Sequence, residues 1–292
     1  MDRTTDGWLS GFAGVLLFSG SLPATRLAVA DLDPLFLTLV RAAVAGGLGL
    51  ALLRASRQAR PARADLAPLA VVALGVVVGF PLLSALALER MSAARSIVFT
   101  GLLPLATAGF AVLRGGERPD RRFWLFALLG SLCIAGFALS RGATSTVAGD
   151  LLMLAAVLVC GLGYAEGAVL SRRLGGWQVI CWALTLALPV MLAALCLVPW
   201  PAPSTIGLPA WIGLGYVSLF SMLIGFMFWY RGLALGGTAA VGQLQLLQPL
   251  IALGLAATLL HEAIGRGMIL AMLAVIACVA GARHFSTRSV TR

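Results

Sequence analysis

The sequence contains no lysine and is short of charged residues of every kind. Of its 292 residues only 11% are charged and 60% are hydrophobic, and the mean hydropathy is +0.99. A soluble domain of this length needs many more charges to cover its surface. The shortage excludes an ordinary soluble protein, so the net charge of +10 does not indicate a nucleic-acid partner.

The motifs of several enzyme classes are also absent. The sequence has no GxxxxGK[ST] loop for an ATPase, no HExxH and no His/Cys cluster for a metal. Its five cysteines form no CxxC pair and lie inside apolar runs, as small buried hydrophobic residues do. We therefore predict a protein that is not an enzyme, with no catalytic residues, no metal and no cofactor.

The sequence does contain a series of apolar runs of about 20 residues, the length that spans a bilayer core. The runs are continuously apolar, which favours helices over the alternating strands of a barrel. The first run lacks a signal cleavage site and is expected to remain as a helix. We predict an all-α polytopic membrane protein with ten transmembrane helices, at residues 7–28, 34–53, 67–88, 93–113, 122–140, 148–170, 177–198, 209–230, 238–260 and 265–284.

One stretch of the sequence occurs twice, at a fixed separation of 145 residues. The first copy contains Pro104 and Glu117, and the second contains Pro249 and Glu262, with matching Leu, Gly and Ala positions between them. A long self-match indicates duplication. The chain is therefore predicted to consist of two repeats of five helices each.

Arginine is concentrated in alternate loops. Fifteen arginines fall on one side of the predicted membrane and five on the other, and the arginine-rich side of a membrane protein is cytoplasmic. Both termini fall on that side. Because each repeat has an odd number of helices, the second, 145–292, must be inverted relative to the first, 1–144. Inverted repeats are typical of secondary transporters, which bind substrate near the midplane between the halves.

These features resemble the drug/metabolite transporter superfamily, and in particular its ten-helix EamA-type permeases. The resemblance rests on the ten-span duplication, on the proline and glutamate of the fourth and ninth spans, and on Arg41 in the second span. It covers nearly the whole chain. Within the family the sequence is most similar to the YddG-type amino-acid exporters. The resemblance implies a central cavity formed mainly by the first, third, fourth, sixth, eighth and ninth spans.

Two ionisable residues within the spans are candidates for coupling or gating, as intramembrane charges generally are. Arg41 lies about 10 Å into the second span at 1.5 Å per residue. It could clamp a substrate carboxylate, or it could reach outward and bind helix-end carbonyls. Glu166 in the sixth span could couple transport to protons, or it could pair with Arg172 and Arg173 near the cytoplasmic surface.

Eight further residues are predicted to bind substrate or line the cavity. The fourth span carries a polar and aromatic stripe at helical spacing, and the ninth carries amides that are costly in hydrocarbon unless they face partners or water. A proline in the third span frees a backbone carbonyl, and a tyrosine in the sixth could stack on a flat solute. Solvated helix ends, interhelical hydrogen bonds and aromatic packing are the alternatives. The predicted residues are Pro81, Ser84, Arg95, Phe99, Thr100, Tyr164, Gln245 and Gln248.

The shared glutamates and the diverged positions of the repeated stretch are expected to have different roles. Glu117 and Glu262 each precede a predicted helix, where a carboxylate stabilises the N-terminus. The copies differ upstream of their prolines, where Thr100 corresponds to Gln245. Selectivity is therefore expected at the diverged positions and not at the glutamates.

Taken together, the sequence predicts a secondary transporter that exports small metabolites by alternating access across the bacterial inner membrane, as a multi-pass protein. Amino acids, including aromatic and other apolar ones, are the expected substrates. The expected partners are this small-molecule substrate and the lipid bilayer, with no nucleic acid, and the protein is expected to function as a monomer. A drug or nucleotide-sugar carrier of the same superfamily is the alternative, and a non-transporting membrane scaffold or enzyme is a more remote one.

Overall fold

The computed structural model describes residues 3–88, 90–91, 93–140, 146–260 and 266–286, and the regular elements among them are helices. In chain order these are α1 (Arg3–Ser19), α2 (Ser21–Val29), α3 (Pro34–Ala55), α4 (Arg63–Val72), η1 (Ala73–Gly79), α5 (Phe80–Leu88), α6 (Ala93–Thr100), α7 (Leu103–Gly115), α8 (Arg121–Leu139), α9 (Val147–Leu174), α10 (Gly176–Leu195), η2 (Pro203–Thr205), α11 (Leu208–Tyr216), η3 (Val217–Ile224), α12 (Gly225–Gly236), α13 (Thr238–Gly242), η4 (Gln243–Leu247), α14 (Gln248–Leu260) and α15 (Arg266–Phe285).

The all-helical prediction is confirmed for the described residues, and so is the presence of several apolar spans. Each predicted span overlaps one helix or a run of consecutive helices, while the number of ten membrane crossings stays a prediction. The segments long and apolar enough to cross a membrane are Arg3–Val29, Pro34–Ala55, Arg63–Ala87, Val147–Leu174, Gly176–Leu195 and Leu208–Gly236, and shorter apolar helices are Leu103–Gly115 and Ile269–Phe285.

Several predicted spans are interrupted where a continuous helix was expected. The third and eighth contain the π-helical segments η1 and η3, in which an amide bonds to the carbonyl five residues back. Pro81 follows η1, and its missing N–H prevents the ordinary α-helical bond at that point. The sequence offset of 145 carries residues 73–79 onto 218–224, within one residue of η3. The two interruptions therefore occupy corresponding places in the two predicted repeats.

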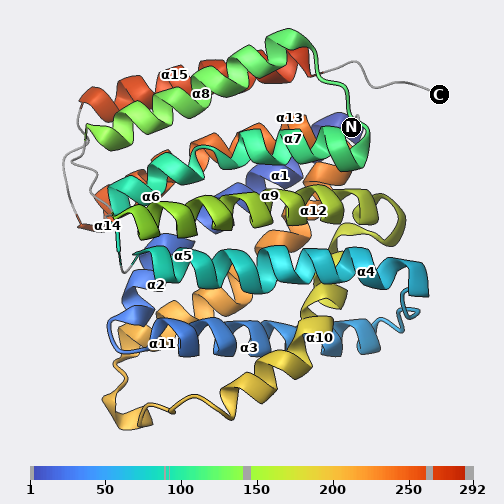
Figure 1. Cartoon of the computed structure of the whole chain (residues 1–292), viewed down its shortest axis with the longest axis vertical. Helices are drawn as coiled ribbons and strands as arrows, with labels where there is room; N and C mark the ends of the chain where they lie inside the picture. The colour runs from blue at the N-terminus through green and yellow to red at the C-terminus, as the bar shows by residue number, and fades with distance from the viewer. Residues whose placement is uncertain (1–2, 89, 92, 141–145, 261–265, 287–292) are drawn as a thin grey trace.

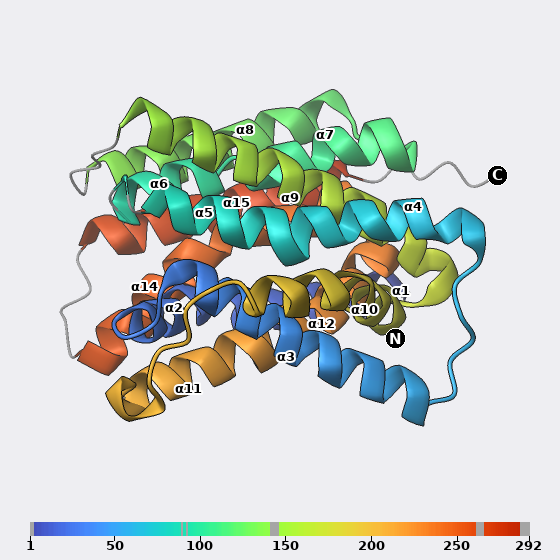
Figure 2. The same ribbon diagram turned by 60° about the horizontal axis from the view of Figure 1, so that its bottom comes forward.

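The helices form two layers (Figure 2). One layer holds α4 to α9, in which α9 packs against α7, α5 and α4; the other holds α1 to α3 and α10 to α12, in which α1 packs against α12 and α3 against α10. α15 runs along α8 (Figure 1). Since α9 belongs to the predicted second repeat and lies among helices of the first, the two repeats are interleaved in space.

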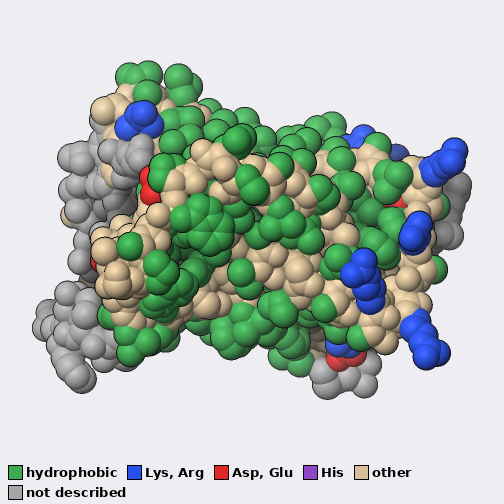
Figure 3. Space-filling view, turned by 90° about the horizontal axis from the view of Figure 1, so that it is seen from below, with side chains coloured by type: hydrophobic (Ala, Val, Ile, Leu, Met, Phe, Trp, Pro, Cys, Tyr) green, Lys and Arg blue, Asp and Glu red, His purple; other side chains and the backbone are tan. Residues whose placement is uncertain are grey.

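Arginine side chains gather at one end of the molecule, which we call the arginine-rich end (Figure 3). α1 begins and α15 ends there, and the connections from α3 to α4 and from α9 to α10 lie there as well (Figure 1). The connections from α2 to α3 and from α10 to α11 lie at the opposite end. Arginines of alternate connections thus lie together in space, as the sequence pattern predicts.

α1 and α12 cross so closely that only glycine fits between them. A Cβ on Gly232 would lie 2.5 Å from the backbone nitrogen of Gly11, and a Cβ on Gly7 would lie 2.4 Å from the backbone nitrogen of Gly236. Small residues that let two backbones approach are a common basis of helix association in membranes. This crossing brings the first helix firmly against the eighth predicted span.

Replacing Gly232 with Ala should destabilise the protein, although alanine favours a helix over glycine by about 1 kcal/mol. The added methyl group meets the backbone of α1, and overpacking of this kind costs about 1–3 kcal/mol. Thermal unfolding of the purified protein in detergent should therefore show a lower Tm. The control is Gly47→Ala on α3, where no atom lies within 4 Å of the added Cβ. Equal Tm values for the two variants would contradict the close crossing.

Candidate functional site

A cavity of about 150 Å³ lies between the two layers, towards the end opposite the arginine-rich end. It extends to Val29 and Pro34, on either side of the α2–α3 connection. The residues that line it are Phe18, Ser19, Ser21, Thr25, Val29, Pro34, Leu37, Thr38, Arg41, Val76, Phe80, Pro81, Ser84, Ala85, Ser96, Thr100, Leu103, Met153, Cys160, Tyr164, Ser221, Phe226, Gln245, Gln248, Pro249 and Ala252.

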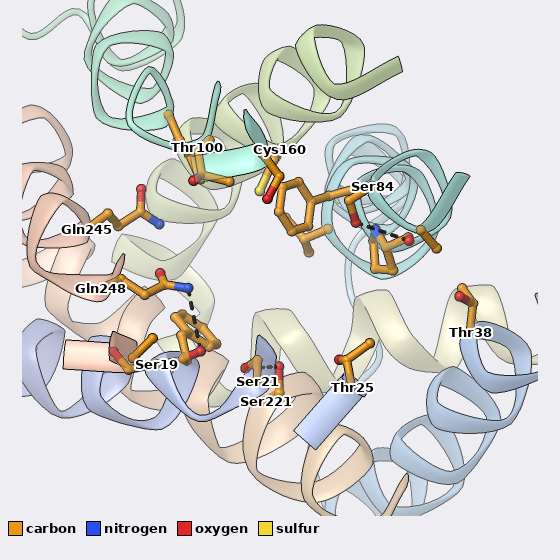
Figure 4. Close-up of a pocket in the computed structure, with 18 of the residues that line it drawn as sticks. Ser19, Ser21, Thr25, Thr38, Ser84, Thr100, Cys160, Ser221, Gln245 and Gln248 are labelled. Atoms are coloured by element: carbon orange, nitrogen blue, oxygen red, sulfur yellow. Dashed lines mark hydrogen bonds between the residues drawn. The ribbon is translucent and has the colours of Figure 1, made fainter. Parts of the chain in front are cut away.

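Two broken helices meet at this cavity. α6 ends at Thr100 and α7 begins at Leu103, while the 3-10 segment η4 separates α13 from α14. Each break lies just ahead of a proline of the repeated stretch. Thr100 and Leu103 from the first break line the cavity together with Gln245 and Gln248 from the second (Figure 4). The diverged positions of the repeat are therefore brought to one site.

The ninth predicted span supplies amide groups to the cavity wall. Gln245 is only 4% exposed, and neither atom of its amide has a hydrogen-bond partner among the described residues. The amide nitrogen of Gln248 lies 3.5 Å from the carbonyl oxygen of Phe18. Gln243 is fully buried and lies outside the cavity lining, as helical spacing predicts. A buried amide without a partner is costly. At the cavity wall, the amide of Gln245 can donate and accept hydrogen bonds, and a bound solute could supply the partners.

One face of α3 also lines the cavity. Pro34, Thr38 and Arg41 are spaced along this face at helical intervals. The helix starts at Asp33, whose carboxylate accepts hydrogen bonds from two amides of the first turn at 2.9 and 3.0 Å. The family resemblance implied a cavity formed mainly by six other spans, and α3 of the second span contributes to the lining as well. The signal in the sequence was Arg41 itself, a charge well inside an apolar run.

Serine and threonine hydroxyl groups are spread around the cavity (Figure 4), and several of them donate their protons to other groups of the protein. Ser19, Thr38 and Ser84 each donate to a backbone carbonyl of their own helix, at 2.7, 2.8 and 3.2 Å. Ser21 donates to Ser221 at 2.8 Å. A hydroxyl whose proton is engaged still has oxygen lone pairs. These side chains therefore present mainly acceptors to a solute. Except for Ser84, none of them was singled out from the sequence, because serine and threonine are common on membrane helices.

An aromatic cluster forms one part of the cavity wall, which we call the floor. Phe18, Tyr164 and Phe226 line the cavity, and Trp229 and Tyr230 lie beneath them, fully buried. The ring centroids of Phe18 and Phe226 are 5.0 Å apart, and those of Tyr164 and Trp229 are 5.5 Å apart. Aromatic pairs at such distances add stability beyond the area they bury. The cluster therefore forms an ordered apolar floor.

The structure brings most of the predicted cavity residues together. Those that line the cavity are Pro81, Ser84, Thr100, Tyr164, Gln245 and Gln248.

Arg95 and Phe99 lie outside the cavity lining. Arg95 forms a bidentate pair with Asp150 at 3.1 and 2.8 Å, and its guanidinium lies 5.5 Å from the centroid of the Phe99 ring. Ser96 and Thr100 line the cavity from the neighbouring face of α6. The predicted stripe thus combined two adjacent faces of one helix.

Glu166 lies away from the cavity. It is 4% exposed, and its carboxylate accepts hydrogen bonds from Arg114 at 2.8 and 3.2 Å. The partners considered from the sequence, Arg172 and Arg173, pair with other carboxylates. A buried carboxylate held by a bidentate guanidinium is well placed to tie α7 to α9.

The carboxylate of Glu117 joins three helices at the arginine-rich end. Its two oxygens accept hydrogen bonds from the first amides of α13, those of Thr238 at 2.8 Å and Ala239 at 2.9 Å. One oxygen also accepts from Arg172 of α9 at 2.9 Å. Gly116, with a φ of 64°, turns the chain at the end of α7 and directs the carboxylate towards α13. Helices α7, α9 and α13 are therefore held together by one side chain.

Glu117 stabilises a helix N-terminus, as predicted from the sequence, but the helix is α13 and not the following α8. The first turn of α8 is capped by Asp120, which accepts from the amide of Arg122 at 2.8 Å. Sequence proximity therefore indicated the wrong helix. Glu262, the second copy of this glutamate, lies outside the described residues.

Replacing Glu117 with Ala should lower the Tm of the purified protein. The substitution removes the acceptor of two α13 amides and the partner of Arg172, and loss of a helix cap alone costs about 0.5–2 kcal/mol. The matched variant is Arg118→Ala, which removes an exposed charge from the next position. It should leave Tm nearly unchanged. Similar Tm values for the Glu117 variant and the wild type would contradict the role of this carboxylate.

Comparisons with known proteins agree with this architecture. A model of the EamA-like transporter family matches residues 6–139 and again residues 147–283. The chain is 63% identical over 286 residues to the uncharacterized transporter YdeK of Bacillus subtilis (strain 168), a match that covers 98% of this chain and 100% of that protein. It also resembles a solved protein crystal structure with a TM-score of 0.78 and 22% identity, over 95% of this chain and 96% of that one. At that identity the resemblance concerns the fold alone.

Proposed function

The chain belongs to the EamA-like transporter family, and we propose that it exports amino acids with aromatic or other apolar side chains. That it is a multi-pass membrane transporter follows from the family and from its apolar helices. The observation that carries the substrate proposal is the cavity between the layers, where two broken helices meet. Substrates of secondary transporters bind beside discontinuous helices near the middle of the membrane.

The chemistry of the cavity supports an amino acid with an apolar side chain. Its floor is aromatic, with Phe18, Tyr164 and Phe226, and its walls carry amide and hydroxyl groups. Binding sites for small molecules typically combine an apolar lining with a few polar groups that fix orientation. In an amino acid with an apolar side chain, the side chain fits the aromatic floor and the charged backbone groups fit the polar walls.

The proposed direction of transport rests on the charge distribution. We place the arginine-rich end in the cytoplasm of a bacterial cell, because arginine-rich loops are retained on that side of the inner membrane. The cavity then lies towards the outside. Helices of the two repeats would tilt against one another, so that the cavity opens alternately to the two sides of the membrane. The solute gradient would drive export.

Reconstituted protein should move labelled leucine or phenylalanine across liposome membranes in a protein-dependent manner. Gln245→Ala should raise KM about tenfold, the effect of losing one or two hydrogen bonds to a charged or polar solute. Gln58→Ala, which removes an amide on the α3–α4 connection outside the cavity lining, should leave KM unchanged.

The outcome of this assay separates the proposal from its alternatives. Flux of larger drugs or nucleotide sugars without flux of any amino acid would favour a different carrier of the same superfamily. Absence of flux for every solute in a folded preparation would favour a membrane scaffold or enzyme. An unchanged KM in the Gln245 variant would remove this residue from the substrate site.

Glu166→Gln should preserve amino-acid flux per folded molecule and its dependence on pH. The amide can still accept a hydrogen bond from Arg114, and the side chain lies outside the cavity. Flux measured between pH 5.5 and 8.5 in both proteins tests this expectation. Loss of pH dependence in the variant alone would instead identify Glu166 as a coupling carboxylate.

A further inference from the structure

Arg41 is a charged side chain without a partner among the described residues. Its Nε atom is fully buried, and the guanidinium makes no hydrogen bond or ion pair with the described residues. The residue lines the cavity from α3. A guanidinium has five N–H donors in a rigid planar arrangement that matches a carboxylate.

The charge of the cavity lining makes this position more unusual. Among the described residues that line the cavity, Arg41 is the one charged side chain, and none carries a carboxylate. Asp33, on the same helix, caps the first turn of α3 and is exposed. Asp150 is held by Arg95 in a bidentate pair. The part of the cavity wall formed by the described residues therefore carries a positive charge and no carboxylate to balance it.

Such a charge is unfavourable in a membrane protein unless something binds to it. Ionisable groups inside membrane spans are costly and normally face a partner or a water-filled space. The buried carboxylates among the described residues follow that rule, since Glu166 pairs with Arg114 and Asp65 pairs with Arg173. Arg41 lines the cavity without such a partner among the described residues.

We infer that the cavity selects solutes that carry a carboxylate, and that Arg41 is the residue that binds this group. This inference rests on the proposed function and specifies the substrate class of the same site. Thr38, one turn away on the same face, and Ser84 have their hydroxyl protons engaged with backbone carbonyls. Their oxygens can accept hydrogen bonds from the ammonium group of an amino acid. Figure 4 shows Thr38 on the opposite side of the cavity from Gln245 and Gln248.

The experiment compares three probes of similar shape on the full-length protein purified in detergent. Leucine has a carboxylate and an ammonium group, 4-methylpentanoate has the carboxylate alone, and leucinamide has the ammonium group alone. Dissociation constants are measured from ligand-dependent shifts in Tm. Leucine and 4-methylpentanoate should bind, whereas leucinamide should bind at least about tenfold more weakly, because it lacks charge-assisted hydrogen bonds to the guanidinium. Inorganic phosphate serves as the second anion and should bind more weakly than leucine.

Arg41→Gln should weaken leucine binding about tenfold or more and abolish the preference for leucine over leucinamide. Arg41→Lys keeps the charge and should retain part of that preference, although it loses bidentate geometry. Arg54→Gln, at the exposed end of the same helix, should behave as the wild type. Without ligand, Arg41→Gln should have a Tm equal to or above that of the wild type, because it removes an unpaired charge from the interior.

Three results obtained with the purified protein in detergent would overturn the inference. One is an unchanged preference for the acid over the amide in Arg41→Gln, and another is tighter binding of leucinamide than of leucine by the wild type. The third is a lower Tm of ligand-free Arg41→Gln, which would give Arg41 a structural role. Binding of the carboxylates without flux in liposomes would leave this inference standing and refute the proposed transport of amino acids. Amino-acid flux that does not depend on Arg41 would refute this inference and leave the proposed transport of amino acids standing.

Discussion

The packing of helices at the arginine-rich end depends on how the first amides of α13 are satisfied. A helix that starts within a membrane protein has orphan N–H groups that need acceptors, because hydrocarbon supplies none. Here the acceptor is the partly buried carboxylate of Glu117, which also binds Arg172. One side chain thereby ties α7 and α9 to α13 and joins the two predicted repeats. The bonds of Glu117 therefore fix the arrangement of three helices at a place outside the cavity lining.

The same backbone constraint explains where the cavity is found. A helix interrupted in the membrane exposes polar backbone groups, and such interruptions are tolerated where they face protein or a water-filled space. The π-segments η1 and η3 and the breaks beside Thr100 and Gln245 all lie around the cavity or next to residues that line it. The repeated prolines, Pro104 and Pro249, each lie a few residues after a helix interruption. They fix the position of the interruption, and the side chains just ahead of them meet the solute.

Sequence reasoning located the helices well and the inward faces less well. Length and hydropathy determine which segments can cross a bilayer, so every predicted span overlaps helices of the structure. Periodicity cannot by itself say which face points inward, because lipid and protein core are both apolar. Arg95 and Phe99 were for this reason grouped with Thr100, although they lie on an adjacent face of α6. The sequence also could not identify the helix that Glu117 stabilises, because that helix begins more than a hundred residues later.

Duplication provides a symmetric frame, and divergence within it provides a site with two different sides. α3 and α10 correspond at the 145-residue offset and pack against each other, yet Arg41 of the first corresponds to Leu186 of the second, which is exposed on the outer surface. Thr100 corresponds in the same way to Gln245, and both line the cavity. A solute with one charged end and one apolar end requires such asymmetry, because identical groups on both sides could not orient it. Changes at a few positions of this kind can give one fold different substrates, whereas the shared prolines and the glycine crossing keep the frame unchanged.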